Sequence, residues 1–260
     1  KFPPAGLVYL AIGGYFEMGE WSLFAESALD YQNLMQKLKE EGIFERYKGF
    51  LKGGIWRNFL VKYPESNQLH KKMLALSHSV QQLEKISKNN RRQSGYLEQA
   101  YTELLKSQCN DGYWHGVFGG LYLPHLRDAL YRHLIQGERH IDQILHQEEK
   151  EWCDSEVFDL DGDGLPEVIL SNPWLKAYFD PAEAGMMFEL DYKPNNFNLV
   201  NSLATRKEHY HQAIAETLQK KNSQQAEEHA SIHDLDKSAD LERLKKFLVY
   251  DRQRRACLID

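Results

Sequence analysis

Apolar residues recur every three or four positions through most of the first half of the chain. This spacing is typical of helices that bury one face against a core. It marks four segments, whose apolar positions run from Phe24 to Leu38, Leu69 to Ile86, Tyr96 to Leu105 and Leu126 to Leu145. We therefore predict that residues 23–148 are mainly helical.

The apolar pattern changes near Trp152 to short runs that are typical of strands. The predicted strands are Val157–Leu160, Pro166–Leu170, Trp174–Phe179, Met186–Tyr192 and Phe247–Tyr250. An earlier run, Leu7–Ile12, is long enough for one more buried strand, and the polar residues 206–245 are interpreted as a helix or a flexible excursion. Helices followed by strands favour an α+β chain with two domains, residues 1–150 and 151–260.

Composition and charge limit the classes of protein that the chain can belong to. It has 260 residues, a formal net charge of −6 and 42% hydrophobic residues, which is enough for one large domain or two ordinary ones. The mild acidity argues against a nucleic-acid partner, and no apolar run approaches the roughly 20 residues that span a membrane. Cys109, Cys153 and Cys257 show neither a disulfide framework nor metal-ligand spacing, so we expect a cytoplasmic protein.

One stretch between the third and fourth predicted helices breaks the rules for helices. Four glycines fall among the nine residues from Gly112 to Gly120, and glycine lets the backbone approach other backbone or a ligand closely. A carboxamide, a carboxylate, an imidazole and large aromatic rings stand beside and between them. This mixture suits a polar ring held against an aromatic face, or else a buried kink in which Tyr113 and Trp114 fill the core.

The residues from Asn110 to Arg127 read Asn-Asp-Gly-Tyr-Trp-His-Gly-Val-Phe-Gly-Gly-Leu-Tyr-Leu-Pro-His-Leu-Arg. This string resembles the last conserved sequence region of glycoside hydrolase family 57, in particular its 4-alpha-glucanotransferases and alpha-amylases. Tyr15–Trp21 and Gly53–Glu65 resemble two further segments of that family. The resemblance implies a helical, bundle-like part of the catalytic region with one remnant barrel strand, followed by the start of an antiparallel β-sandwich.

The resemblance also implies a retaining enzyme that acts on alpha-glucan or maltooligosaccharide. We place transfer between alpha-1,4-glucan chains before alpha-amylase hydrolysis. The alternative is a non-catalytic module that binds alpha-glucan or serves a structural role. In the family a Glu and an Asp on earlier barrel strands form the catalytic pair, and this sequence contains neither motif, so no residue is assigned as catalytic.

Substrate binding is instead assigned to the loop and its expected neighbours. The carboxylate of Asp111 can accept hydrogen bonds from sugar hydroxyls, Trp114 offers an apolar ring face, and His115 can donate or accept near neutral pH. We expect these three on one concave, partly exposed surface near Glu17–Trp21. The other candidate residues are Asn110, Tyr113, Glu17, Glu20, Trp56 and Arg57.

Four of these candidates have an equally simple structural interpretation. Glu17 and Glu20 suit the first turn of a helix, where the helix dipole favours acidic side chains. The segment that contains Trp56, Arg57 and Lys62 either lines a sugar cleft or forms a kinked loop, with Trp56 in the core and Arg57 paired to a carboxylate.

A second chemical signal is the acidic sequence that begins at Asp159. Asp159, Asp161, Asp163 and Glu167 can supply oxygen ligands to Ca²⁺, although an acidic hairpin turn explains the same residues. An EF-hand is excluded because its twelfth position would be Leu170. No cofactor is required by the sequence, and Ca²⁺ is the one metal that it suggests.

Two further expectations concern histidines and self-association. The pairs His209/His211 and His229/His233 have no third metal ligand at suitable spacing, so a surface role is favoured over zinc binding. An apolar strand with open edges seeks a partner, so Leu7–Ile12 either packs under the following helix or pairs between chains in a homo-oligomer.

Overall fold

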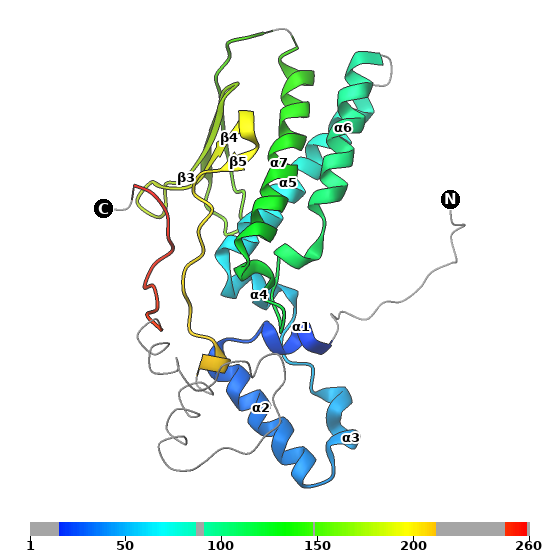
Figure 1. Ribbon diagram of the computed structural model, residues 1–260, viewed down its shortest axis with the longest axis vertical. Helices are drawn as coiled ribbons and strands as arrows, with labels where there is room; N and C mark the ends of the chain where they lie inside the picture. Colours follow the sequence, from blue (N-terminus) through cyan, green and yellow to red (C-terminus); the bar gives the residue numbers. More distant parts are fainter. Residues whose placement is uncertain (1–15, 87–90, 148, 212–247, 259–260) are drawn as a thin grey trace, which may run out of the picture.

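The computed structural model describes residues 16–86, 91–147, 149–211 and 248–258 (Figure 1). The predicted strand at Leu7–Ile12 and most of the polar stretch at 206–245 lie outside the described residues. Within the described part of the chain, no helix is both long and apolar enough to cross a membrane.

Helices occupy the first half of the described chain, as the apolar spacing predicts. They are α1 (Phe16–Trp21), α2 (Ala25–Glu40), α3 (Phe44–Tyr47), α4 (Trp56–Lys62), α5 (Pro64–Ile86), α6 (Arg91–Ser107) and α7 (Pro124–Leu145). Short 3-10 turns follow at η1 (Lys48–Phe50), η2 (Asn110–Gly112) and η3 (Gly120–Tyr122). The long helices α5, α6 and α7 lie side by side, while α1, α2 and α3 form a smaller group at the other end (Figure 1).

The apolar faces of α5, α6 and α7 meet in one core. Its buried members are Leu69, Met73, Leu76, Val80, Ala100, Leu104, Tyr113, Leu130, Tyr131, Leu134, Ile135 and Ile141. These residues include positions from three of the four predicted helical stripes, so the three- and four-residue spacing indicated the correct faces. At the crossing of α5 and α7, a Cβ added to Gly137 would lie 2.7 Å from the Leu76 side chain, so glycine allows the close approach there.

A proline fixes the corner between α4 and α5. Pro64 is the first residue of α5, where its missing N–H and fixed φ are tolerated. The residue before a proline avoids the helical region, and Tyr63 has φ −125° and ψ 85°. The corner directs the buried Tyr63 and Phe59 side chains into a second core cluster with Leu121, against which Trp114 also packs.

The strands form one antiparallel sheet in the order β1-β2-β3-β4-β5. Their bounds are β1 (Asp154–Phe158), β2 (Glu167–Ser171), β3 (Leu175–Asp180), β4 (Met186–Tyr192) and β5 (Phe197–Asn198), with the turn η4 (Lys193–Asn195) before β5. The sheet lies beside α7 (Figure 1). The predicted α+β class is confirmed, and the described residues contain one sheet of the expected sandwich.

The strand predicted at Phe247–Tyr250 is wrong for its described part. Leu248, Val249 and Tyr250 adopt no regular structure, and Val249 is 70% exposed. Three consecutive apolar residues predict a strand only where a neighbouring strand can accept their hydrogen bonds. Here the backbone joins the sheet only later, in a single bridge between Cys257 and Met187.

Buried charges join the helices to the sheet. Lys72 of α5 contacts Glu189 and Asp191 of β4, lies 3.2 Å from Glu138 of α7, and donates to the Tyr178 hydroxyl of β3 at 2.9 Å. Burial, together with the neighbouring carboxylates, raises the pKa of Asp191 well above its ordinary value despite the attraction of Lys72. We call these five residues the Lys72 cluster. The cluster links the helical part of the chain, which ends at Leu145, to the strands, which begin at Asp154.

Candidate functional site

The glycine-rich loop, residues 110–121, is closed by a backbone hydrogen bond between Leu121 and Trp114. The N–H of Leu121 donates to the Trp114 carbonyl at 3.0 Å. Gly120 has φ +45°, and an added Cβ would lie 2.0 Å from that same carbonyl oxygen. Only glycine fits at this close approach, which confirms the expected role of a glycine in the loop.

His115 of the loop is enclosed by aromatic rings from three other parts of the chain. Its ring centroid lies 5.3 Å from that of Trp21 in α1, 5.8 Å from Phe59, 5.1 Å from Tyr63, and 4.7 Å from Tyr122. The side chain is 2% exposed. The loop is therefore fixed from beneath by α1, by the corner between α4 and α5, and by η3.

The polar atoms under the loop converge on one buried carboxylate, Glu208. Its Oε1 accepts hydrogen bonds from the hydroxyls of Tyr63 and Tyr122, the latter at 2.8 Å, and its Oε2 accepts from the Lys62 Nζ at 2.8 Å. Tyr63 also contacts His115 Nε2. Because the single hydroxyl proton of Tyr63 goes to the carboxylate, His115 Nε2 donates to the Tyr63 oxygen. We call these five residues the Glu208 network.

Electrostatics set the protonation states in the Glu208 network. Burial lowers the pKa of His115 to about 4, with the positive charge of Lys62 acting in the same direction, so its imidazole is neutral at pH 7. Burial opposes the ionisation of Glu208, but Lys62 and the Tyr63 hydroxyl outweigh it and lower the pKa of the carboxyl. Burial raises the pKa of both Tyr63 and Tyr122. The network thus holds one carboxylate and one ammonium, with every other member neutral.

The predicted loop residues do not all lie on one exposed surface. Asn110 and Asp111 are exposed, and Trp114 is half-buried. His115 is buried instead, because the Tyr63 hydroxyl beneath the loop satisfies its Nε2. Tyr113 is also buried, where its hydroxyl donates to the Ser107 carbonyl at 2.7 Å.

The other predicted site residues occupy mixed environments. Glu20 of α1 accepts a hydrogen bond from Gln32 at 2.6 Å. Trp56 stacks on Phe59 with ring centroids 5.5 Å apart, while Arg57 is exposed. The side chain of Glu17 lies outside the described part. The predicted neighbourhood of the loop with Glu17–Trp21 is confirmed at Trp21, through its ring contact with His115.

Four members of the Glu208 network were not among the candidate residues, although Lys62 stands in the segment that was predicted to line a sugar cleft or form a kinked loop. Tyr63 and Tyr122 stand within the segments that carry the family resemblance, so a signal for them existed. Glu208 stands in a polar stretch and meets Tyr63 across 145 sequence positions, for which the sequence offers no local sign. The predicted surface role of His209 is wrong, since His209 is 5% exposed and its ring lies 4.9 Å from that of Trp21.

The acidic loop between β1 and β2 gathers three of its four predicted ligands. Oxygens of Asp159, Asp161 and Glu167 lie within 4.8 Å of one another, and Asp163 is not part of this group. Asp159 accepts hydrogen bonds from three backbone N–H groups, those of Gly162, Asp163 and Gly164, at 2.7, 3.1 and 3.0 Å. Burial, with the charge of Asp163, raises the pKa of Asp161. The loop is thus both an ordered acidic turn and a group of carboxylates with the spacing that a cation needs.

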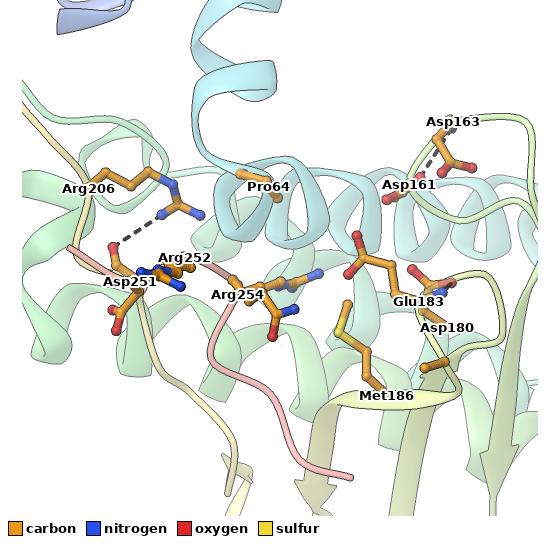
Figure 2. A pocket seen from close by; sticks show the side chains of 13 residues that line it. Pro64, Asp161, Asp163, Asp180, Glu183, Met186, Arg206, Asp251, Arg252 and Arg254 are labelled. Carbon is orange, nitrogen blue, oxygen red and sulfur yellow. Dashed lines mark hydrogen bonds between the residues drawn. The ribbon is translucent and has the colours of Figure 1, made fainter. Parts of the chain in front are cut away.

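Beside this loop lies a cavity of about 680 Å³ that is lined by charged residues of both signs. Figure 2 shows Asp161 and Glu183 at one end, and Arg206 with Asp251 at the other. Arg254 projects between them, and its guanidinium lies 5.2 Å from the Phe188 ring.

Comparison with known proteins assigns the whole arrangement to a family. The model for the middle domain of alpha-amylase/4-alpha-glucanotransferase matches residues 54–141, and the model for the C-terminal domain matches residues 159–260. The first match contains the loop and most of the Glu208 network, and the second contains Glu208 and the acidic loop. The chain therefore belongs to the alpha-amylase/4-alpha-glucanotransferase family, of the glycoside hydrolase family 57 type.

Individual relatives agree with this assignment over the full chain. It is 42% identical over 260 residues to the 4-alpha-glucanotransferase of Thermococcus litoralis and 42% identical to an alpha-amylase of Pyrococcus abyssi. Each match covers 100% of this chain but only 35% and 36% of the relative. The crystal structure of the Thermococcus litoralis 4-alpha-glucanotransferase matches with a TM-score of 0.70 and 40% identity, over 98% of this chain and 34% of that one. The chain thus spans about a third of the length of these relatives.

Proposed function

We propose that this chain supplies a glucan-binding loop to a retaining enzyme that acts on alpha-1,4-glucan. A 4-alpha-glucanotransferase is our first choice and an alpha-amylase our second. The observation that supports the proposal is the Glu208 network, which fixes the family's loop from beneath while Asn110, Asp111 and Trp114 keep solvent-accessible surface. A loop fixed from its buried side is preorganised for a ligand on its exposed side.

The exposed side of the loop carries the groups that sugars need. The carboxylate of Asp111 accepts hydrogen bonds from sugar hydroxyls, and the ring of Trp114 covers the apolar C–H face of a glucose unit. Precise positioning of the bound sugar contributes to rate even when the reacting carboxylates stand elsewhere. In this proposal the chain binds and orients glucan, and no residue of it is assigned to bond cleavage.

Calorimetric titration of the chain with maltoheptaose tests the proposal, alongside a turnover assay. We expect binding without turnover, and we expect Trp114→Ala to weaken binding about tenfold, since one aromatic contact contributes roughly 0.5–1.5 kcal/mol. Trp174→Ala is the matched control, because Trp174 is 63% exposed in the sheet turn before β3. Equal affinities for the parent and Trp114→Ala would contradict the assignment of the loop to glucan binding. Turnover by the chain alone would contradict the proposal that none of its residues takes part in bond cleavage.

A non-catalytic module that binds alpha-glucan or serves a structural role is the second candidate, because no residue of this sequence is assigned as catalytic. The two candidates differ in how Asp111→Asn affects a longer protein that contains this chain. A glucan-orienting role in catalysis predicts lower kcat for the longer protein, whereas a module that only tethers glucan predicts a raised KM at unchanged kcat.

We further propose Ca²⁺ as a ligand of Asp159, Asp161 and Glu167, supported by their oxygens within 4.8 Å of one another. A cytoplasmic location is supported by three exposed free cysteines, which a reducing compartment keeps as thiols. The absence of a nucleic-acid partner, supported by the net charge of −6, is also part of the proposal. Homo-oligomer formation through Leu7–Ile12 stays a prediction that light scattering can test.

A further inference from the structure

A second cavity, of about 510 Å³, opens between the start of α2 and two C-terminal segments. It is lined by Phe24, Ala25, Glu26, Ser27, Lys62, Arg206, Lys207, Tyr250 and Asp251. We call it the Phe24–Tyr250 cavity. Its volume falls within the roughly 300–1,000 Å³ of small-molecule sites. None of the sugar-binding residues assigned to the glycine-rich loop lines it.

Two aromatic rings give the cavity exposed apolar surface. Phe24 is 54% exposed and Tyr250 is 37% exposed. The ring of Tyr250 stacks on His211 with centroids 5.6 Å apart and an angle of 20° between the planes, and its hydroxyl lies 3.1 Å from His211 Nδ1. This double contact holds the Tyr250 ring in one orientation. A fixed aromatic face beside polar groups is suited to the C–H face of a sugar ring.

The charged groups around the cavity are balanced by partners. Lys62 pairs with Glu208 at 2.8 Å, and Arg206 pairs with Glu65 at 2.8 Å. At the rim Lys207 lies 3.4 Å from Glu26. The carboxylate of Asp251 accepts from the Thr205 N–H at 2.7 Å and pairs with Arg255 at 2.8 Å.

This balance selects the chemical class of the ligand. An anion or a cation would have to break one of the ion pairs, whereas a neutral polyhydroxyl compound can donate to the carboxylates and accept from the ammonium and guanidinium groups. Arg206 and Asp251 also line the larger cavity of Figure 2, so the two cavities adjoin and can follow one extended chain.

We propose that the Phe24–Tyr250 cavity is a second binding site for an α-glucan chain. The proposal rests on the proposed function for the identity of the sugar, and on the cavity itself for the presence of a site. Glucose units stack on Phe24 and Tyr250, and their hydroxyls exchange hydrogen bonds with Glu26, Lys207 and Asp251.

The test is a calorimetric titration of the whole chain with maltoheptaose. The double variant Phe24→Ala/Tyr250→Ala should bind at the second site at least about tenfold more weakly, because two aromatic contacts are lost. Ser27→Trp fills the cavity from an exposed position and should have the same effect without removing any packing. Phe50→Ala is the matched control, since Phe50 is 83% exposed and does not line the cavity. Unchanged binding in both the double variant and Ser27→Trp would overturn the proposal.

The same titration with cellohexaose separates the second site from the proposed function. Maltoheptaose binding that depends on Trp114 but not on the cavity keeps the proposed function and overturns the second site. Binding of cellohexaose in the cavity, with none of maltoheptaose, overturns the proposed substrate of the protein and the α-glucan identity of the site, while the cavity remains a sugar site. A parent chain that binds neither sugar overturns both proposals.

Discussion

Two buried lysines, ten positions apart, hold carboxylates in two different settings. Lys72 meets three carboxylates, those of Glu138, Glu189 and Asp191, where α5 and α7 pack against the sheet. Lys62 meets one, that of Glu208, beneath the glycine-rich loop. Each lysine has a tyrosine hydroxyl in its network, Tyr178 in the first and Tyr63 in the second.

The difference lies in charge balance and in what each network supports. The Lys72 cluster has an excess of carboxylates, so burial and repulsion raise the pKa of Asp191, and all its members belong to regular helices and strands. The Glu208 network is balanced and holds a loop and an irregular segment together. We infer that the first network holds the fold together and that the second positions a binding surface.

Lys72→Met should give the largest effect on stability. Removal of the ammonium leaves the buried carboxylates of Glu189 and Asp191 without their cation, while Glu138 keeps Lys176 at 2.9 Å. Breaking a buried pair in this way costs about 3–5 kcal/mol. Guanidinium unfolding measures the loss. Lys37→Met in the exposed face of α2 is the control, with an expected change below about 0.5 kcal/mol. Equal losses in the two variants would show that the Lys72 cluster carries no special role.

Acid should act on the two networks in opposite directions. The pKa of His115 falls from 6.5 to about 4 on folding. Between these two pH values the imidazole is protonated in the unfolded chain and neutral in the folded chain. The stability from His115 is therefore present above pH 6.5 and is lost as the pH falls toward 4, by about 3 kcal/mol. Asp191 has a raised pKa, so its contribution is fully present below pH 3.8 and declines as the pH rises above it.

Unfolding free energies measured between pH 7 and pH 4 test this contrast. His115→Gln should flatten the fall in stability on acidification. Asp191→Asn should make that fall steeper, because it removes the destabilisation that the Asp191 carboxylate causes at neutral pH. A parent chain with the same slope as His115→Gln would contradict the neutral, buried state of His115.

Calcium should have a smaller effect, confined to the acidic loop. Binding only to the folded chain adds about 2.7 kcal/mol at a hundredfold excess over Kd, which raises the melting temperature by roughly 5–10 °C. Asp161→Ala should abolish the rise, while Asp163→Ala, outside the group of three ligands, should retain most of it. The same melting temperature for the parent chain in Ca²⁺ and in chelator would leave the loop as an ordinary acidic turn.

The sequence predicted the regular elements well because their signals are local. The apolar spacing of α5 and α7 and the short run of β4 each depend on residues close together in the chain. The run at Leu248–Tyr250 misled because a strand also needs a partner, and the described residues around it supply none. Resemblance to a family located the loop, which spacing alone left as either a site or a buried kink.

The buried centre of the site was beyond local patterns. Glu208 reads as one charge in a polar stretch, and its meaning depends on Lys62 and Tyr63, about 145 positions earlier. The burial of His115 follows from the same long-range contacts. Residues whose role depends on distant partners need the fold before they can be recognised.

The central claim is that the Glu208 network positions a glucan-binding loop, and a matched pair of variants tests it directly. Tyr63→Phe removes the hydroxyl that joins His115 to Glu208, and Tyr178→Phe removes the equivalent hydroxyl from the Lys72 cluster. Both tyrosines are at most 1% exposed, and each loss should cost stability by about 1–3 kcal/mol without unfolding the chain. The deciding measurement is the Kd for maltoheptaose. We predict a higher Kd, and so weaker binding, for Tyr63→Phe, and the Kd of the parent chain for Tyr178→Phe. A parent-like Kd for Tyr63→Phe, or equal weakening in both variants, would contradict the account.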